Sequence, residues 1–255
     1  MKKAILVISF GTSYRETLER TIGAVEEDIR RAYPKYEVRR AFTSGMIIKK
    51  LRERDGVETD TVSDALEKLV NEGFSEVICA VTHIINGFEY DKIIKSAKIF
   101  SDRINIKITR PLVSLTEDYA EVIKAIGHIF DNDKIYILMG HGTEHFANAA
   151  YPALDYHFKA DGFDNVYVGT VEGFPELGNI IDEIKKQECR NAVLMPFMLV
   201  AGDHAINDMA VEWKEALEAE GFSVECIMRG LGEYKGIRNL YIKRVEDEKR
   251  GAEHF

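Results

Sequence analysis

The sequence predicts an α/β fold of two similar halves, each a doubly wound parallel sheet covered by helices on both faces. Short apolar runs alternate with amphipathic helical stretches along the chain, and this alternation restarts near the middle with matching motifs. The chain has 255 residues, 45% of them hydrophobic, which suffices for one large or two small α/β domains. We expect halves at residues 1–130 and 131–255, packed around a central cleft.

The first half opens with an apolar run typical of a buried strand, Ala4–Ser9, followed by helical spacing of apolar residues over Glu16–Tyr33. The later segments alternate in the same way. Strands are expected at Glu37–Phe42, Glu76–Val81 and Ile104–Ile108, and helices at Met46–Arg54, Thr61–Glu72, Tyr90–Phe100 and Glu117–Phe130.

The second half starts with the strand Lys134–Met139 and repeats segments of the first half in the same order. The matching pairs are "ILVISFGTS" (5–13) with "YILMGHGTE" (136–144), "VRRAFTSG" (38–45) with "VYVGTVEG" (166–173), and "VICAVTHIINGFE" (77–89) with "AVLMPFMLVAGDH" (192–204). Three matches in one order predict an internal duplication. A helix should follow from His204, and the polar tail from Val245 should fray.

Composition excludes several classes of protein. The net charge of −9 does not favour binding to nucleic acid or an anionic membrane, and no apolar run approaches the roughly 20 residues of a membrane span. The start, "MKKAILVISFGTS", has the lysines of a signal peptide but no cleavage site, so we expect a strand there and a cytoplasmic protein. The three cysteines are too few and too far apart for a disulfide framework or a zinc knuckle.

Polar residues follow the three matching strands of the second half, at His141, Glu172 and His204. Ligands of open parallel sheets bind at the carboxyl ends of the strands, and a flavodoxin-like strand order of 2-1-3 makes these strands neighbours. Two imidazoles and a carboxylate suit a divalent first-row metal and leave coordination positions open. The matching positions of the first half are Phe10, Ser44 and Glu89.

The histidines differ in how strongly the sequence supports them as metal ligands. A single histidine at a turn, His141 included, is commonly bonded to a nearby carbonyl instead of a ligand. His145 has the i, i+4 spacing to His141, but the two need not face together if the helix begins near Thr143. His83 ends the third strand of the first half and is expected in the cleft. His204 begins a helix, whose positive end favours the neutral ring that a ligand or base needs.

Two further motifs have alternative interpretations. The glycine turns "GTS" and "GHGT" resemble phosphate-binding loops, but no complete nucleotide motif follows, so we expect no nucleotide. The basic run "IIKKLRER" is either a solvated helix face or a source of positive charge, through Lys49, Lys50 and Arg52, for an acidic ligand.

These motifs together resemble the anaerobic sirohydrochlorin cobaltochelatases, which belong to the ferrochelatase-like class II chelatases. The similarity covers nearly the whole chain. It is carried by "SFGTS", by "GHGT" at 140–143, by "VEG" at 171–173 and most specifically by "PFMLVAGDHAINDM" at 196–209.

The resemblance implies a chelatase-like fold and insertion of Co²⁺ into sirohydrochlorin, a tetrapyrrole with eight carboxylates, without ATP. It assigns the metal to His141, Glu172 and His204, and we expect His141 also to accept a pyrrole proton. Haem is not expected, because the relatives that bind it are exported. The sequence does not decide whether the protein forms a homo-oligomer. We expect the substrate to contact Phe10, Gly11, Thr12, His83 and Glu89.

Alternatives remain at this point. Iron or nickel instead of cobalt would suit the same ligands. A non-catalytic protein that carries a metal or a tetrapyrrole would also use such a site.

Overall fold

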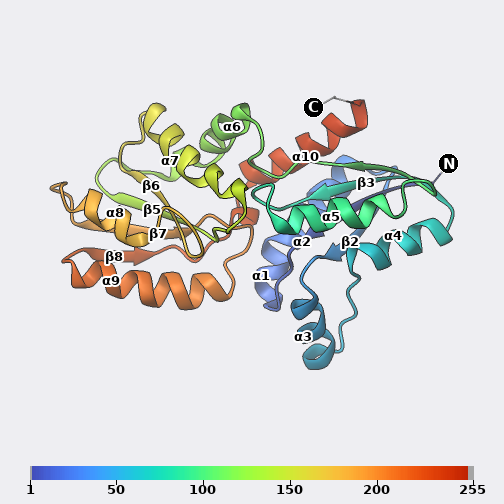
Figure 1. Cartoon of the computed structure of the whole chain (residues 1–255), viewed down its shortest axis with the longest axis horizontal. Helices are drawn as coiled ribbons and strands as arrows, with labels where there is room; N and C mark the ends of the chain where they lie inside the picture. The colour runs from blue at the N-terminus through green and yellow to red at the C-terminus, as the bar shows by residue number, and fades with distance from the viewer. Residues whose placement is uncertain (1, 252–255) are drawn as a thin grey trace. The chain divides into compact units, whose positions relative to one another are not determined.

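The computed structural model describes residues 2–251 and divides into two compact units. Unit 1 comprises residues 1–112 and 238–255, and unit 2 comprises residues 113–237. Each unit contains one parallel four-stranded sheet, ordered β2-β1-β3-β4 in unit 1 and β6-β5-β7-β8 in unit 2 (Figure 1). The prediction of two similar doubly wound halves is confirmed, and both sheets have the predicted 2-1-3 order.

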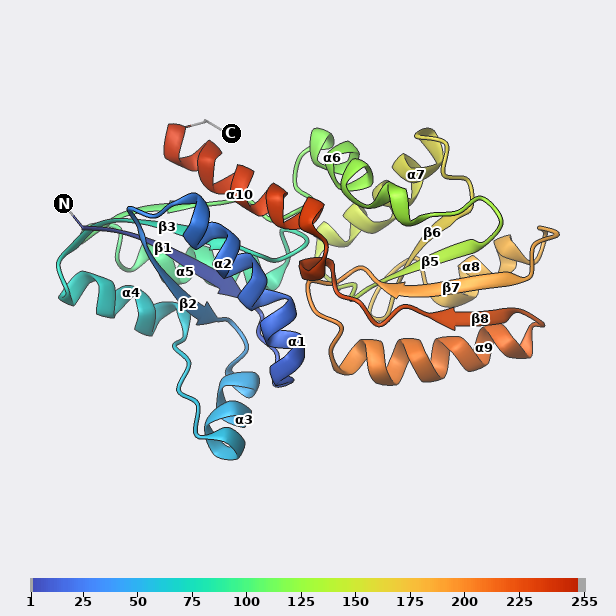
Figure 2. The same ribbon diagram turned by 180° about the vertical axis from the view of Figure 1, so that it is seen from behind.

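Unit 1 holds ten of the named elements. They are β1 (Lys2–Ser9), α1 (Arg15–Arg20), α2 (Ile22–Ala32), β2 (Glu37–Phe42), α3 (Gly45–Asp55), α4 (Val62–Asn71), β3 (Phe74–Val81), α5 (Phe88–Lys98), β4 (Asn105–Ile108) and most of α10 (Lys235–Arg250). Helices α4 and α5 cover one face of the sheet, while α2 and α10 lie on the other (Figure 2).

Unit 2 repeats the arrangement. Its elements are α6 (Thr116–Ile126), η1 (Gly127–Ile129), β5 (Ile135–Gly140), η2 (Phe146–Ala149), α7 (Ala150–Ala160), β6 (Val166–Thr170), α8 (Leu177–Ile184), β7 (Asn191–Pro196), η3 (Ala205–Trp213), α9 (Lys214–Ala219), β8 (Ser223–Cys226) and η4 (Leu231–Glu233). Strand β8 was not predicted, because it is a short edge strand with alternating exposed and half-buried residues and no apolar run.

Backbone hydrogen bonds establish which residues of the two units correspond. In unit 2, the N–H of Glu172 donates to the carbonyl of His141 at 2.8 Å; in unit 1, the N–H of Ser44 donates to the carbonyl of Phe10 at 3.2 Å. Each donor lies two residues after the second strand of its sheet, and each acceptor directly follows the first strand. The predicted duplication therefore holds at the level of single residues: Phe10 corresponds to His141, and Ser44 to Glu172.

The division into units differs from the expected boundary at residues 130 and 131. Helix α6 belongs to unit 2, because the chain after it joins an aromatic cluster there: the Phe130 ring lies 5.0 Å from Tyr136, 5.6 Å from Phe158 and 5.8 Å from Phe163. The spacing of residues 117–130 predicted a helix but not the unit against which it packs, since that depends on tertiary contacts.

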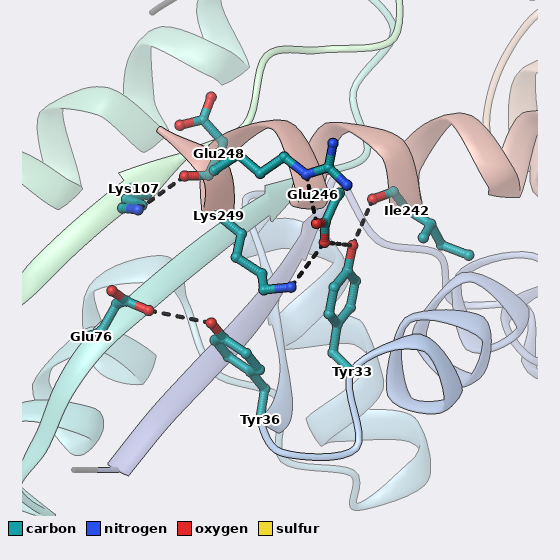
Figure 3. A network of polar contacts seen from close by, with 9 residues as sticks. Tyr33, Tyr36, Glu76, Lys107, Ile242, Glu246, Glu248 and Lys249 are labelled. Atoms are coloured by element: carbon teal, nitrogen blue, oxygen red, sulfur yellow. Dashed lines mark hydrogen bonds and ion pairs between the residues drawn. The ribbon is translucent and has the colours of Figure 1, made fainter. Parts of the chain in front are cut away.

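The polar tail does not fray as expected, because α10 continues to Arg250 and is held on unit 1 (Figure 3). The Tyr33 hydroxyl donates to the carbonyl of Ile242 at 3.0 Å and lies 3.3 Å from the Glu246 carboxylate. Lys107 donates to the carbonyl of Glu248 at 2.9 Å. Residues 252–255 lie outside the described part of the chain.

The expected single helix Glu16–Tyr33 is divided into α1 and α2 at Thr21. The Thr21 hydroxyl donates to the carbonyl of Thr17 at 2.5 Å, a side-chain bond to the preceding turn that is known to bend helices. No helix formed by residues 2–251 is both long enough and apolar enough to cross a membrane.

Candidate functional site

His141 lies at the mouth of β5, held by two glycines with different roles. A Cβ on Gly140 would lie 2.3 Å from the ring of Tyr151, so only glycine lets that ring pack against the end of the strand. Gly142 has φ +79°, and a Cβ there would lie 2.7 Å from the carbonyl carbon of Glu172. The "GHG" motif therefore makes a left-handed turn that brings His141 against the loop containing Glu172.

The orientation of His141 leaves one ring nitrogen available. Its Nδ1 lies 2.9 Å from the carbonyl oxygen of Gly142. A carbonyl only accepts, so Nδ1 carries the hydrogen and the lone pair lies on Nε2. The turn-histidine alternative is thus correct about Nδ1, yet it leaves Nε2 free to bind a metal or accept a proton. The side chain is 43% exposed, so solutes reach it.

Glu172 lies next to His141 on the loop after β6. Its Oε2 is 3.8 Å from Nδ1 of His141, and its side chain is 60% exposed. The loop is closed at its other end by Thr170, whose N–H and hydroxyl both donate to the carbonyl of Pro175, at 2.7 and 3.1 Å. The backbone of Glu172 is fixed in this way while its carboxylate remains free to turn.

Asn148, which the sequence did not single out, joins the two loops. Its Oδ1 accepts from the N–H of Thr143 at 3.1 Å, and its Nδ2 donates to the carbonyl of Phe174 at 2.7 Å. A Cβ on Gly173 would lie 2.5 Å from that Oδ1, so the glycine of "VEG" makes room for the Asn148 amide. No sequence signal indicated this role, because a helix was expected to begin near Thr143 and Asn148 would have been an ordinary residue within it.

His204 is the second imidazole of the site, at the start of the helical stretch after β7 as predicted. Its ring centroid lies 4.7 Å from that of His141, with the ring planes at 87°. Metal–nitrogen bonds of about 2.1 Å place two imidazoles on one ion with centroids on the order of 5 Å apart. Asp208 holds the other side of the ring, with Oδ2 2.5 Å from Nδ1 of His204.

The structure thus brings His141 next to both Glu172 and His204. Among residues 2–251, however, no group of three or more His, Cys, Asp or Glu side chains is arranged to hold a metal ion. The Glu172 carboxylate faces the Nδ1 edge of His141, not its free Nε2 edge. Rotation of this exposed side chain would be required for three ligands to meet at one ion, so the shared site remains a prediction.

His145 makes local contacts of its own. Its Nδ1 accepts from the N–H of Ala147 at 3.1 Å and caps the short helix η2, and its ring lies 4.0 Å from that of Phe146. The helix that was expected near Thr143 begins only at Phe146, so His141 and His145 do not share a helix face.

Candidate residues of unit 1 surround the end of its sheet. Phe10 is 46% exposed, as a contact surface requires. Gly11 has φ +104°, and a Cβ there would lie 2.7 Å from the Phe42 ring. Thr12 is 3% exposed, and its hydroxyl accepts from the N–H of Tyr14 at 3.3 Å, a bond that stabilises the turn.

His83 and Glu89 contain buried polar atoms, His83 Nδ1 and Glu89 Oε2, without a hydrogen-bond partner among the described residues. Burial lowers the pKa of His83 to about 4, so its ring is neutral at physiological pH. Its Nε2 lies 3.4 Å from the Thr43 hydroxyl. Lys92 pairs with the Glu89 carboxylate.

The basic run lies within α3, and its charged side chains are solvent-exposed, in keeping with the ordinary interpretation of such a run. Lys49 lies 3.8 Å from Glu53, and Arg52 lies 3.9 Å from Glu58. The Lys50 ammonium is 5.9 Å from the centre of the Tyr14 ring. These long contacts leave the lysines free to meet an acidic ligand.

Comparison with known proteins identifies the family of the chain. The family model for cobalt chelatase (CbiK) matches residues 3–249. Sirohydrochlorin cobaltochelatase of Salmonella typhimurium is 42% identical over 254 residues, which cover 96% of each chain. Sirohydrochlorin cobaltochelatase CbiKC of Nitratidesulfovibrio vulgaris is 31% identical over 255 residues, covering 96% of this chain and 89% of the relative.

A solved structure supports the fold alone. SirB from Bacillus subtilis with Fe³⁺ superposes with a TM-score of 0.71 at 15% identity, over 99% of this chain and 98% of that one. The resemblance inferred from the sequence motifs is confirmed by the family match, which spans almost every residue of the chain. The chain belongs to the cobalt chelatase (CbiK) family, whose members are metal-chelating enzymes.

Proposed function

We propose that this chain is a sirohydrochlorin cobaltochelatase, which inserts Co²⁺ into sirohydrochlorin as the named relatives do, without nucleotide or haem. The observation that carries the proposal is the pair His141 and His204, whose rings lie 4.7 Å apart and whose Nδ1 atoms are both occupied by hydrogen bonds. Both Nε2 lone pairs are therefore available at the end of one sheet. The cytoplasm, predicted from the sequence, suits such a biosynthetic enzyme.

The chemistry of insertion has three requirements: a metal that has lost part of its water shell, removal of two pyrrole protons and a positioned macrocycle. His141 and His204 would take the metal through Nε2, and Glu172 would complete the set by rotating its exposed carboxylate. Three protein ligands leave positions for pyrrole nitrogens, as in open catalytic metal sites.

His141 is the residue we assign to proton transfer. Its side chain is 43% exposed, Nε2 carries the lone pair of the neutral ring, and the hydrogen bond from Nδ1 to the carbonyl of Gly142 stabilises the ring when Nε2 gains a proton. The same nitrogen cannot hold the metal and a proton at once. His141 would therefore accept a pyrrole proton only while it is free of Co²⁺, and would pass each of the two protons to solvent, which reaches its 43% exposed side chain.

The substrate carries acidic groups, whereas the chain has a net charge of −9, so local cations must offset the repulsion. We assign this role to Lys49 and Lys50. We assign contacts with the macrocycle to Phe10, Gly11 and Thr12 and, at the end of the third strand, to His83 and Glu89.

The test is a metallation assay in which insertion of the metal is monitored by absorbance. Purified protein is mixed with sirohydrochlorin and Co²⁺, and the rate is compared with that of the uncatalysed mixture. We expect clear acceleration, a loss of about 10²–10⁴-fold in His141→Ala, and partial recovery with added imidazole. His128→Ala is the control, because His128 is an exposed histidine that precedes β5, whereas His141 follows the other end of that strand. Wild-type protein that binds Co²⁺ and sirohydrochlorin without acceleration would identify a carrier instead.

A further inference from the structure

His204 is held by a carboxylate from its own helix. Asp208 Oδ2 lies 2.5 Å from His204 Nδ1, and the two residues are four apart in sequence. The Asp208 side chain is 23% exposed and the His204 side chain 40%. A carboxylate only accepts hydrogen bonds, so His204 carries its hydrogen on Nδ1 and presents the lone pair of Nε2.

The backbone around Asp208 is firmly placed. Residues Ala205–Trp213 form a π-helix, a rare geometry that is frequent at functional sites. Ala205 and Met209, on either side of Asp208 in sequence, are completely buried, and Trp213 is 6% exposed. These apolar anchors fix the helix on the sheet, so the carboxylate approaches His204 from a defined direction.

The two imidazoles of the site reach the same tautomer by different means. His141 donates from Nδ1 to a neutral backbone carbonyl, that of Gly142, whereas His204 donates to a charged carboxylate. The negative charge of Asp208 also offsets the positive end of the helix on which His204 lies, which would otherwise weaken cation binding.

We propose that Asp208 is a positioning residue for the metal substrate: it holds His204 in the Nδ1–H tautomer and directs Nε2 toward the incoming Co²⁺. This inference rests on the proposed function. Carboxylates that orient metal-binding histidines in this way raise the basicity of the ligand. Asp208 itself would not touch the ion.

The first readout needs no metal. Two-bond ¹H–¹⁵N correlation spectra of ¹⁵N-histidine protein, recorded where the rings are neutral, identify which nitrogen of each ring carries the hydrogen. We expect His204 to have the Nδ1–H pattern in the wild type and to lose it in Asp208→Ala. His141 should keep its pattern in both proteins, because its partner is the backbone of Gly142.

The second readout is the affinity for Co²⁺, which is measured from the visible absorption of the bound ion. We expect Asp208→Ala to bind Co²⁺ about 10- to 100-fold more weakly than the wild type. Asp208→Asn keeps the shape and one acceptor oxygen and should fall between the two, which covers the case in which the alanine variant does not fold. Glu212→Gln, which neutralises an exposed carboxylate on the same π-helix, is the matched control and should bind as the wild type does.

The outcomes separate the inference from the function on which it rests. If His204→Ala weakens Co²⁺ binding while Asp208→Ala keeps both the Nδ1–H tautomer and an affinity within about twofold of the wild type, Asp208 has no positioning role. If His204→Ala also binds Co²⁺ normally, His204 is not a metal ligand, and the proposed site falls together with the inference.

Discussion

Phe10 and His141 occupy the same position in the two units, directly after the first strand of each sheet. Each accepts a backbone hydrogen bond from the corresponding residue of the next loop, Ser44 for Phe10 and Glu172 for His141. The duplicated framework therefore carries an apolar ring at one site and a proton-accepting ring at the other. In the proposed function, this difference would assign the metal and the protons to unit 2 and contact with the macrocycle to unit 1.

Replacing Phe10 by alanine should weaken sirohydrochlorin binding by about 1–2 kcal/mol, since part of its half-exposed ring surface would be covered by substrate. Co²⁺ affinity should not change. Separate absorbance titrations with sirohydrochlorin and with Co²⁺ check both statements. Ile99→Ala is the control, because Ile99 is an exposed apolar residue that directly follows α5. Equal loss of both affinities would argue against the division of roles.

Gly142→Ala should displace Glu172 and weaken Co²⁺ binding, because the new methyl group would lie 2.7 Å from the Glu172 carbonyl carbon. It should also cost about 1–3 kcal/mol of stability from the left-handed backbone. Gly162→Ala is the matched control: φ is +88° and nothing lies within 4 Å of the added Cβ, so it has the strain without the collision. Calorimetry and Co²⁺ titration measure the two effects, and normal Co²⁺ binding by Gly142→Ala would show that the turn does not position Glu172.

Reversing charge in Lys49→Glu/Lys50→Glu should raise the dissociation constant for sirohydrochlorin, and high salt should reduce the difference from the wild type. The matched control is Lys95→Glu/Lys98→Glu, an exposed pair in the last turn of α5. If both double variants weaken binding equally, only the net charge matters and α3 is an ordinary solvated helix.

The partly buried His83 predicts a pH dependence of stability. Its pKa is lowered to about 4 in the folded protein, against about 6.5 in the unfolded chain. Between these values the unfolded state binds more protons, so stability is retained above about pH 6.5 and falls as the pH decreases toward 4, by at most about 3 kcal/mol. Denaturant unfolding at several pH values should show a shallower loss for His83→Asn than for the wild type. Parallel curves would mean that His83 is protonated equally in both states.

The sequence predicted the features that depend on local pattern. Buried strands were identified from continuous apolar runs, and the position of His141 from the glycines at the end of its strand. The helical pattern after His204 predicted its position at a helix start. The duplication predicted all three candidate ligands at strand ends, which is correct for His141 and Glu172 but wrong for His204, because β7 ends at Pro196 and a loop separates it from His204.

Features that depend on packing or on rotamers were not predictable. The hydrogen bonds of Asn148 link loops that are far apart in sequence. The contact between Asp208 and His204 depends on the helix geometry, and nothing in the sequence distinguishes Asp208 from other acidic residues. The attachment of α10 to unit 1 depends on Tyr33, more than 200 residues earlier in the chain. The rotamer of Glu172, which decides whether a three-ligand site is assembled, has no signature in the sequence.

The proposed metal site requires that His141, Glu172 and His204 bind one ion. The most direct measurement is anomalous diffraction at the cobalt edge from crystals of the Co²⁺-loaded protein. We expect a single strong peak about 2.0–2.2 Å from Nε2 of His141, from Nε2 of His204 and from a Glu172 oxygen. A fully occupied peak bound elsewhere, with Nε2 of His141 and of His204 left free, would contradict it.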